Sequence, residues 1–325
     1  MRLLIHAKSY ARLQAEIDAV PGVESVVMDD DGALTLAGEA LAPETAVFEA
    51  AWANADSFFS PSVRAFMTAV LKSPALTWVQ SGAAGTDVPV FGAIVAKGAT
   101  LTTTHVQATG IADYVLWGVL DHFQRGPERR ANQGERRWDK LPFRDVHGTR
   151  WLIVGFGTIG QETARRARAF DAQVTGVRRT PGGHPLADRM VSDWREVLPE
   201  ADVVVLSLPL TAASAGMANA EAFAMMKPGS VLVNVGRGGL VDEAALVAAL
   251  DRGAPAHAVL DVTVTEPLPA ESPLWAHPRV NLTAHTAGVG SSTEARGDRG
   301  FLDNLRRFAA GEPLAGAVNP ADVGG

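Results

Sequence analysis

The sequence predicts an α/β protein with a doubly wound parallel sheet and a second, smaller α/β domain. Three observations support this fold class. Short apolar runs alternate with helical stretches through the second half of the chain. A glycine-rich turn separates the first of these runs from the helical stretch behind it. The length of 325 residues suggests two domains, at about 150 residues each.

The composition narrows the class of protein. Hydrophobic residues make up 47% and charged residues 20% of the chain, which provides enough apolar material for packed cores. The net charge of -7 argues against a general nucleic-acid binder. The apolar run near Met1 is broken by His6 and Lys8, and no stretch approaches the ~18 apolar residues of a membrane span. The chain contains no cysteine, which excludes disulfides and Cys-ligated metals. We therefore expect a cytoplasmic protein with no membrane or nucleic-acid partner and no metal site.

Short apolar runs predict the strands of the main sheet, because each is typical of a strand that is buried on both faces. Gln161–Phe170 and Glu243–Leu250 are typical of helices, and Asp242 is a candidate N-cap for the second of them. The predicted strands are Trp151–Val154, Val174–Val177, Asp202–Leu208, Ser230–Val235, Ala256–Asp261 and Val280–Thr283.

The first 109 residues show a weaker alternation of the same kind. Leu3–Ile5 and Leu76–Val79 predict strands, and Ala42–Ala53 predicts a helix. The second of these strands leads into the glycine turn Ser81–Gly85. Ile111–Phe123 predicts an apolar helix that is long enough to bridge two domains.

A polar and basic run covers residues 125–150, with eight Lys and Arg against four acidic residues. One interpretation is a solvated surface loop. The alternative is an arm that reaches a partner subunit.

The turn after Val154 follows the pattern G-x-G-x-x-G, with Gly155, Gly157 and Gly160. Between a strand and a helix, the first glycine permits the tight turn and the second lets the backbone approach a pyrophosphate. The third allows close helix–strand packing. The helix N-terminus, around Thr158 and Ile159, presents N–H groups to the phosphates. The pattern predicts a Rossmann-type dinucleotide site.

The end of the second strand indicates which dinucleotide binds. NAD enzymes usually place Asp or Glu there to bind the ribose 2′-OH. Here Arg178, Arg179 and Thr180 follow the strand, and Arg178 lies 18 residues beyond Gly160. Arginine matches phosphate geometry, so this segment predicts a preference for NADPH, with NADH as the alternative. Two exposed surface arginines without a ligand role are the other interpretation.

Three further residues with useful chemistry follow predicted strands. Arg237 lies in a glycine-rich turn, Glu266 precedes a proline, and His285 follows the last strand. Ligands bind beyond the carboxyl ends of strands in sheets of this class. Each residue alone is unremarkable, since a single histidine in a loop is more often structural than catalytic.

Together, in this order and spacing, the motifs resemble the D-isomer-specific 2-hydroxyacid dehydrogenase family, within its glyoxylate/hydroxypyruvate reductase-like branch. The resemblance runs from Leu76 to Ala317, and more loosely to the N-terminus. Ala284 stands where proline is commoner. The matching segments are Gly155–Gly160, Ser207–Thr211, Val233–Gly238 with Val241–Asp242, Leu260–Val262 with Glu266–Leu268, Pro273–Trp275, and His285 with Ala287–Gly288.

The resemblance implies that NADPH reduces a small 2-oxo acid to a D-2-hydroxy acid. It implies that His285 is the general acid and that Glu266 orients the ring and favours its protonated form. It implies that Arg237 holds the substrate carboxylate and polarises the reacting carbonyl.

The resemblance also implies contacts with the ligands. The backbone N–H groups of Ala84 and Gly85 would bind the substrate carboxylate. Asp261 would bind the nicotinamide amide, and Pro209 and Thr211 would line the cofactor groove.

The motifs redraw the domain division. We expect residues 110–290 to form the dinucleotide-binding domain, and residues 1–109 with 291–325 to form a discontinuous, flavodoxin-like substrate-binding domain. The resemblance implies a homodimer that packs through Leu116–Arg150, with Trp138 a candidate for an aromatic that enters the neighbouring active site. Two alternatives stay open: a non-catalytic NAD(P)-binding sensor or co-repressor on the same fold, and an NAD-linked relative with another small acid substrate.

Overall fold

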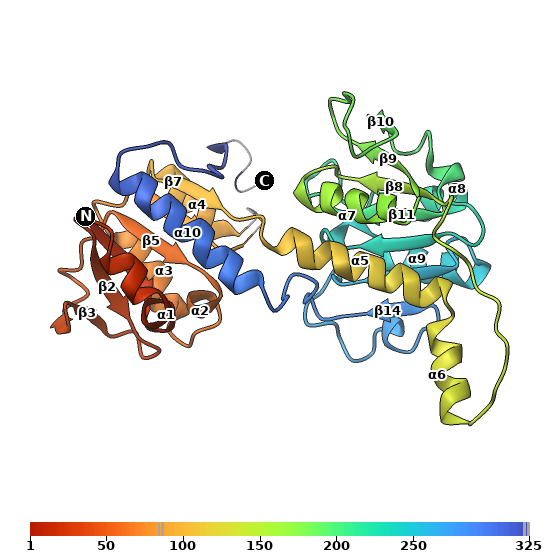
Figure 1. Ribbon diagram of the computed structural model, residues 1–325, viewed down its shortest axis with the longest axis horizontal. Coiled ribbons are helices and arrows are strands. Elements are labelled where there is room, and N and C mark those ends of the chain that lie inside the picture. The colour runs from red at the N-terminus through yellow and green to blue at the C-terminus, as the bar shows by residue number, and fades with distance from the viewer. Residues whose placement is uncertain (84, 86–87, 321–322, 324–325) are drawn as a thin grey trace. The chain divides into compact units, whose positions relative to one another are not determined.

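The computed structural model describes residues 1–83, 85, 88–320 and 323 (Figure 1). The chain divides into two compact units, Met1–Val106 with Ser291–Gly325, and Gln107–Gly290. The second unit is therefore inserted into the chain of the first. Each unit is built around its own sheet.

The second unit contains a seven-stranded sheet in the order β10-β9-β8-β11-β12-β13-β14, in which every neighbouring pair is parallel. Numbered along the chain, this order begins 3-2-1-4-5-6, which is that of dinucleotide-binding doubly wound sheets. The strand order reverses between β8 and β11. The predicted doubly wound parallel sheet is confirmed. The strands are β8 (Arg150–Val154), β9 (Gln173–Val177), β10 (Arg189–Val191), β11 (Val203–Leu206), β12 (Val231–Asn234), β13 (His257–Leu260) and β14 (Val280–Leu282).

Both faces of this sheet are buried, which is why its strands read as continuous apolar runs. In β11, Val204 and Leu206 belong to one hydrophobic cluster, whereas Val203 and Val205 belong to another. This alternation follows from the two-residue period of a strand. The helices of the unit are α5 (Gln107–Phe123), α6 (Gly126–Gly134), α7 (Thr158–Ala169), α8 (Ala220–Met225) and α9 (Glu243–Arg252).

The first unit contains a seven-stranded sheet in the order β4-β3-β2-β1-β5-β6-β7. Strands β2, β1, β5, β6 and β7 are parallel, in the 2-1-3-4-5 order of flavodoxin-like sheets, and β3 and β4 add an antiparallel edge. The predicted second α/β fold is confirmed. The strands are β1 (Arg2–His6), β2 (Glu24–Met28), β3 (Leu34–Leu36), β4 (Glu39–Leu41), β5 (Ala50–Ala53), β6 (Trp78–Ser81) and β7 (Thr100–Thr103).

Aromatic side chains from both ends of the first unit's sequence share one core. The rings of Trp52 and Phe301 stack with centroids 4.8 Å apart, and Phe308 lies 5.0 Å from Trp78. Both phenylalanines come from α10, so this helix covers the tryptophans of β5 and β6. The helices of the unit are α1 (Ala7–Asp18), α2 (Ala55–Phe58), α3 (Val63–Lys72), α4 (Pro89–Ala96) and α10 (Thr293–Ala309).

The predicted helix at Ala42–Ala53 is wrong. Its last four residues form β5, which pairs with β1 on one side and β6 on the other. Three alanines favour a helix by propensity. Here complete burial in the middle of a sheet decides the conformation instead, because Ala50 and Trp52 are 0% and 1% exposed.

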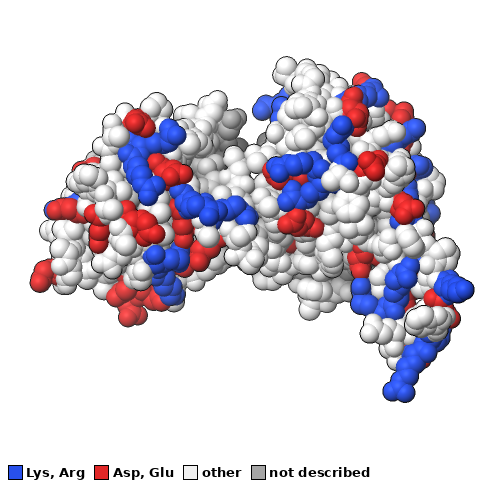
Figure 2. All heavy atoms as spheres, viewed as in Figure 1, with Lys and Arg blue, Asp and Glu red and all other residues white. Residues whose placement is uncertain are grey.

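The surface-loop interpretation of residues 125–150 is wrong for α6. This helix begins after Arg125, which has a left-handed backbone, and Pro127 lies in its first turn. Figure 2 shows Lys and Arg side chains gathered over α6 and the segment that follows it. Within the described part of the chain, no helix combines the length and apolar character that crossing a membrane requires.

Candidate active site

The turn between β8 and α7 leaves room for a phosphate above its backbone. Gly155 has a φ of +93°, and a Cβ there would lie 2.7 Å from the carbonyl oxygen of Ser207. A Cβ on Gly160 would lie 2.4 Å from the carbonyl oxygen of Gly155, whereas one on Gly157 would meet nothing within 4 Å. The N-terminus of α7 has no side-chain cap at Gly157. These residues fit the pyrophosphate of a dinucleotide, because the exposed N–H groups of the helix lack a side-chain acceptor.

Arg178 folds back over this turn. Its Nε donates a 2.8 Å hydrogen bond to the carbonyl oxygen of Phe156, and its guanidinium lies 5.8 Å from the centre of the Phe156 ring. Arg179 and Thr180 follow it on the exposed end of β9. The structure therefore assigns Arg178 a bond to the turn, and it leaves Arg179 and Thr180 on the surface beside it.

The segment after β11 is a compact turn held by Ser214. The Ser214 hydroxyl donates to the carbonyl oxygen of Pro209 at 2.9 Å and accepts the N–H of Thr211 at 2.8 Å. Ser207 binds the carbonyl oxygen of Gly155 at 2.9 Å, across the point where the strand order reverses. Pro209 and Thr211 thus belong to a turn whose first residues reach the glycine turn through Ser207. Their contact with a cofactor stays a prediction.

Arg237 lies in a tight turn after β12. The Asn234 amide donates to the carbonyl oxygen of Arg237 at 2.9 Å and accepts the N–H of Gly236 at 3.1 Å. A Cβ on Gly238 would lie 1.9 Å from the carbonyl carbon of Thr263. Only a glycine allows this approach, and so the Arg237 turn packs directly on the segment that leads to Glu266.

Nδ1 of His285 lies 2.8 Å from Oε2 of Glu266, which is within the distance of an ion pair. The other carboxylate oxygen of Glu266 accepts the N–H of Thr263 at 3.1 Å. The side chains of His285 and Glu266 are 51% and 39% exposed. Because Nδ1 faces Glu266, Nε2 is the ring nitrogen that remains for a ligand.

Asp261 holds the loop that carries His285. Its carboxylate is buried and accepts the N–H groups of Thr286 and Ala287 at 2.9 and 3.1 Å, and the Thr283 hydroxyl lies 2.6 Å from Oδ1. The main chain adds a 2.8 Å bond from the N–H of His285 to the carbonyl oxygen of Asp261. We therefore assign Asp261 a positioning role that the sequence prediction did not include; its contact with a nicotinamide amide stays a prediction.

Tyr114 extends this network from α5. Its hydroxyl lies 2.8 Å from that of Thr283. Burial raises the pKa of Tyr114 to about 12, so the phenol remains neutral. The sequence analysis missed Tyr114, because nothing in the pattern of an apolar helix marks one tyrosine as the neighbour of a loop 169 residues away.

The predicted substrate loop belongs to the first unit, at the end of β6. Ser81 accepts the N–H of Ala83 at 3.0 Å, and a Cβ on Gly82 would lie 3.1 Å from Cα of Asn54. Gly85 is partly buried, whereas Ala84 lies outside the described residues.

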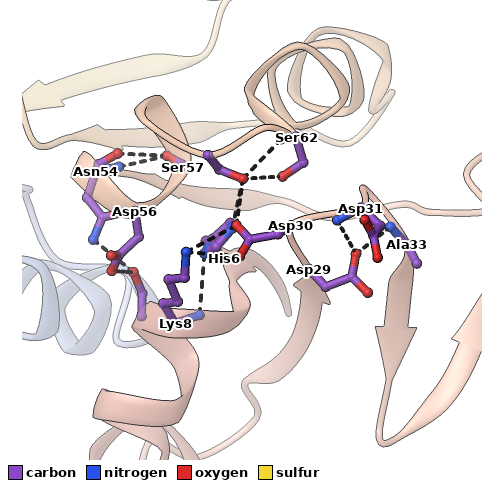
Figure 3. A network of polar contacts seen from close by, with 12 residues as sticks. His6, Lys8, Asp29, Asp30, Asp31, Ala33, Asn54, Asp56, Ser57 and Ser62 are labelled. Atoms are coloured by element: carbon purple, nitrogen blue, oxygen red, sulfur yellow. Dashed lines mark hydrogen bonds and ion pairs between the residues drawn. The ribbon is translucent and has the colours of Figure 1, made fainter.

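The first unit also places a Ser, a His and an Asp together, at the carboxyl end of β1 (Figure 3). Nε2 of the buried His6 lies 3.2 Å from the Ser60 hydroxyl and 3.3 Å from Asp30. Nδ1 of the same ring accepts the N–H of Lys8. A hydrolytic triad requires the serine and the carboxylate on opposite ring nitrogens. This network therefore ties β1 to its neighbours and does not activate a nucleophile.

The fold of the second unit and its glycine turn define a dinucleotide-binding protein of the Rossmann class. Residues 116–287 match the family model for the NAD binding domain of D-isomer specific 2-hydroxyacid dehydrogenases. The chain is 34% identical over 215 residues to glyoxylate/hydroxypyruvate reductase A of Salmonella typhimurium. This alignment covers 64% of this chain and 67% of the reductase.

Solved structures are similar to this protein along nearly the whole chain. A D-isomer specific 2-hydroxyacid dehydrogenase from Xanthobacter autotrophicus, solved with NADPH and MES, is 30% identical and covers 98% of both chains with a TM-score of 0.76. An NADPH-dependent glyoxylate/hydroxypyruvate reductase from Sinorhizobium meliloti, solved with NADP and sulfate, is 25% identical and covers 99% of both chains with a TM-score of 0.77. The chain belongs to the D-isomer specific 2-hydroxyacid dehydrogenase family. It is an NAD(P)-dependent oxidoreductase.

Proposed function

We propose that the protein reduces small 2-oxo acids of the glyoxylate and hydroxypyruvate type to D-2-hydroxy acids, with NADPH as the preferred reductant. The observation that carries this proposal is the pair of His285 and Glu266, 2.8 Å apart and beyond the carboxyl ends of β13 and β14. Further support comes from the relatives in Salmonella typhimurium and Sinorhizobium meliloti, both of which are named glyoxylate/hydroxypyruvate reductases.

The proton chemistry belongs to His285. A dinucleotide held by the turn Gly155–Gly160 would supply the hydride for C2 of the 2-oxo acid. His285 donates a proton from Nε2 to the C2 oxygen, since Nδ1 is engaged by Glu266. Glu266 fixes the orientation of the ring and favours its protonated form. In the oxidative direction the neutral ring takes the same proton back.

Arg237 provides the electrostatic part of the mechanism. A guanidinium is a permanent cation with several donors, so it can bind the substrate carboxylate and stabilise the negative charge that develops on the C2 oxygen. It cannot exchange protons at neutral pH, which leaves that task to His285. The backbone N–H groups of Ala84 and Gly85 would supply further donors to the carboxylate.

The preference for NADPH rests on the residues that follow β9. Arg179 and Thr180 are exposed there, and residues 178–180 include no carboxylate that would repel a 2′-phosphate. The Xanthobacter autotrophicus and Sinorhizobium meliloti relatives were solved with NADPH and NADP, respectively.

We also propose a homodimer that packs through the region Leu116–Arg150. Trp117 is 50% exposed, and it lines an apolar groove of about 620 Å³ between α5 and α7, together with Leu120 and Phe170. Trp138 is 96% exposed and is available to a second copy. The molar mass in solution tests this proposal, and we expect Trp117→Glu to weaken the dimer. If the unmodified protein has the mass of a monomer and Trp117→Glu leaves that mass unchanged, the proposal is contradicted.

A substrate panel tests the proposed reaction. The full-length protein is mixed with NADPH or NADH and with glyoxylate, hydroxypyruvate or pyruvate, and oxidation of the cofactor is followed by absorbance. We expect the highest kcat/KM with NADPH and one of the first two acids. Binding of NADPH without turnover of any 2-oxo acid would overturn the proposed activity, and a higher kcat/KM with NADH would overturn the cofactor preference.

A further inference from the structure

The loop that carries Glu266 has little apolar packing of its own. It follows β13, and residues 264–267 are all exposed, with Val264 at 57%. Hydrophobic stabilisation grows with the apolar area that is removed from water, so burial contributes little to the position of these residues. Polar contacts therefore have to fix where the loop lies.

Two of these contacts belong to Glu266 itself. Its Oε1 accepts the N–H of Thr263 at 3.1 Å, and its Oε2 lies 2.8 Å from Nδ1 of His285. The Thr263 hydroxyl donates to the carbonyl oxygen of Thr265 at 2.9 Å, which closes the turn. The orientation of the Glu266 carboxylate thus depends on the backbone of residues 263–265.

A second carboxylate, that of Glu243, binds the same backbone. Oε1 of Glu243 accepts the N–H of Val264 at 2.7 Å. A hydrogen bond to an ionised acceptor is about twice as strong as one between neutral groups. The N–H groups of Thr263 and Val264 are therefore bound by Glu266 and Glu243, respectively.

Glu243 extends from a firmly held element. It is the first residue of α9 and follows the N-cap Asp242, whose side chain accepts the N–H of Ala245 at 3.0 Å. Leu246, in the next turn of α9, is 0% exposed. A negative charge at this end of a helix is also favoured by the helix dipole. The carboxylate that binds Val264 is thus carried by a capped and packed helix.

The Arg237 turn contacts the same peptide group. A Cβ on Gly238 would lie 1.9 Å from the carbonyl carbon of Thr263 and 2.4 Å from the nitrogen of Val264. The Thr263–Val264 peptide is therefore packed against the Arg237 turn and bound at its N–H by Glu243.

We propose that Glu243 is a positioning residue of the active site, which holds the Thr263–Val264 peptide so that Glu266 reaches Nδ1 of His285. Its effect on turnover rests on the proposed function. Glu243 acts through Glu266 and takes no part in hydride or proton transfer. The alternative is that Glu243 only stabilises the N-terminus of α9.

Glu243→Met and Glu243→Gln form a matched pair. Both new side chains have nearly the length of glutamate and are good helix formers. The glutamine amide offers the N–H of Val264 an acceptor, whereas methionine offers only a weak one. Glu221→Met is the control, because Glu221 is an exposed acidic residue in the first turn of α8. The variants leave unchanged the other charged residues of the proposed site, which are Arg237, Asp261 and Glu266.

The first measurement does not require turnover. In the full-length protein with labelled histidines, NMR follows the titration of the His285 ring, whose signal is assigned by its absence in His285→Gln. A carboxylate next to the ring favours the protonated form, so displacement of Glu266 in Glu243→Met should move this titration to lower pH. Glu243→Gln should move it by less than half as much, and Glu221→Met should leave it unchanged.

The second measurement is turnover with the best 2-oxo acid. Glu243→Met should lower kcat by about tenfold, because a small displacement of a catalytic group is costly. The basic limb of its pH profile of kcat/KM should move to lower pH. The KM and the Kd for NADPH should stay within about twofold, since Arg237 and the glycine turn are retained. Should Glu243→Met fail to fold, which thermal unfolding reveals, Glu243→Ala takes its place.

Three results would overturn the proposal. They are an unchanged His285 titration in Glu243→Met, which would leave Glu243 a residue that only stabilises α9; equal shifts in Glu243→Met and Glu243→Gln, which would assign the effect to charge alone; and the same shift in Glu221→Met. If no 2-oxo acid is turned over, the proposed function fails, but the His285 titration still decides whether Glu243 positions Glu266.

Discussion

The N–H of His285 donates a 2.8 Å hydrogen bond to the carbonyl oxygen of Asp261, so the two residues are joined through the main chain. The Asp261 carboxylate binds the two residues that follow His285. His285 itself has a φ of +55°, which is unusual for a residue with a Cβ. The position of the imidazole therefore depends on Asp261 as well as on Glu266.

We predict that Asp261→Ala lowers kcat by about 10- to 100-fold, because a displacement of the His285 loop by a fraction of an ångström misaligns the proton donor. Asp261→Asn should be milder, since it keeps an acceptor for the N–H groups of Thr286 and Ala287. Steady-state kinetics with the best 2-oxo acid measures both variants. A kcat for Asp261→Ala within twofold of the unmodified value would show that the loop holds its shape without the carboxylate.

His285→Gln should reduce kcat by about 10²- to 10⁴-fold, since the side chain loses its proton donor. The Kd for NADPH should stay the same, because the glycine turn and Arg179 are untouched. Glu266→Gln should cause a smaller loss, as the amide can still bind the ring but favours its protonated form less. Fluorescence titration of NADPH and turnover assays separate the two effects. Near-normal turnover in His285→Gln would contradict the mechanism.

Arg179→Gln should lower kcat/KM for NADPH by about tenfold and leave kcat/KM for NADH nearly unchanged, because only NADPH carries a 2′-phosphate for the guanidinium. Arg252→Gln is the control, because Arg252 is an exposed residue in the last turn of α9. Both cofactors are measured at saturating 2-oxo acid. Equal losses with NADPH and NADH would mean that Arg179 supports the structure of the turn instead.

Gly238→Ala should lower the free energy of unfolding of the second unit by about 1–3 kcal/mol or more. The reason is that the new Cβ would lie 1.9 Å from a backbone carbon of Thr263. Gly183→Ala is the matched control, since a Cβ there meets nothing within 4 Å. Denaturant unfolding of both variants measures the difference. If Gly238→Ala is as stable as Gly183→Ala, the close packing between the Arg237 turn and the Glu266 segment is absent in solution.

The buried His257 should make the protein less stable as the pH falls. Its folded pKa is about 3, against ~6.5 in the unfolded chain. Between these values only the unfolded chain binds the proton. The free energy of unfolding therefore decreases below pH ~6.5, by up to about 1.4 kcal/mol per pH unit.

Unfolding measured between pH 6.5 and 5 reports on buried histidines, because most carboxylates stay ionised there. Burial also lowers the pKa of His122, so His122 adds to the same slope. His257→Phe should flatten the slope. His147→Gln, whose side chain is 79% exposed in the native protein, should leave it unchanged. An unchanged slope in His257→Phe would assign the pH dependence to other groups.

Sequence patterns predicted the main sheet well, because its strands are buried on both faces and therefore read as apolar runs. The predicted run Val280–Thr283, for example, differs from β14 by a single residue. The same reasoning failed at Ala50–Ala53, where an alanine-rich segment is a strand only because β1 and β6 lie on either side of it. Pairing partners distant in the sequence leave no local signal.

The residues of the candidate site divide in the same way, into those that a local sequence pattern marks and those that it does not. The glycine turn, Arg237, Glu266 and His285 could be proposed as site residues because each follows a strand end in a recognisable spacing. The roles of Asp261 and Tyr114 in holding the His285 loop were not found. Such roles depend on hydrogen bonds across the fold, and a sequence shows which groups can make bonds but not which groups meet.

The stacking of Phe301 on Trp52 has a consequence for the order in which the chain acquires its structure. A ribosome releases Trp52 and Trp78 long before it makes α10, and the whole of residues 107–290 emerges in between. During that interval the tryptophans of β5 and β6 lack the helix that covers them. The inserted unit, by contrast, is continuous in sequence, so it can complete its sheet while the first unit is still waiting for its final helix.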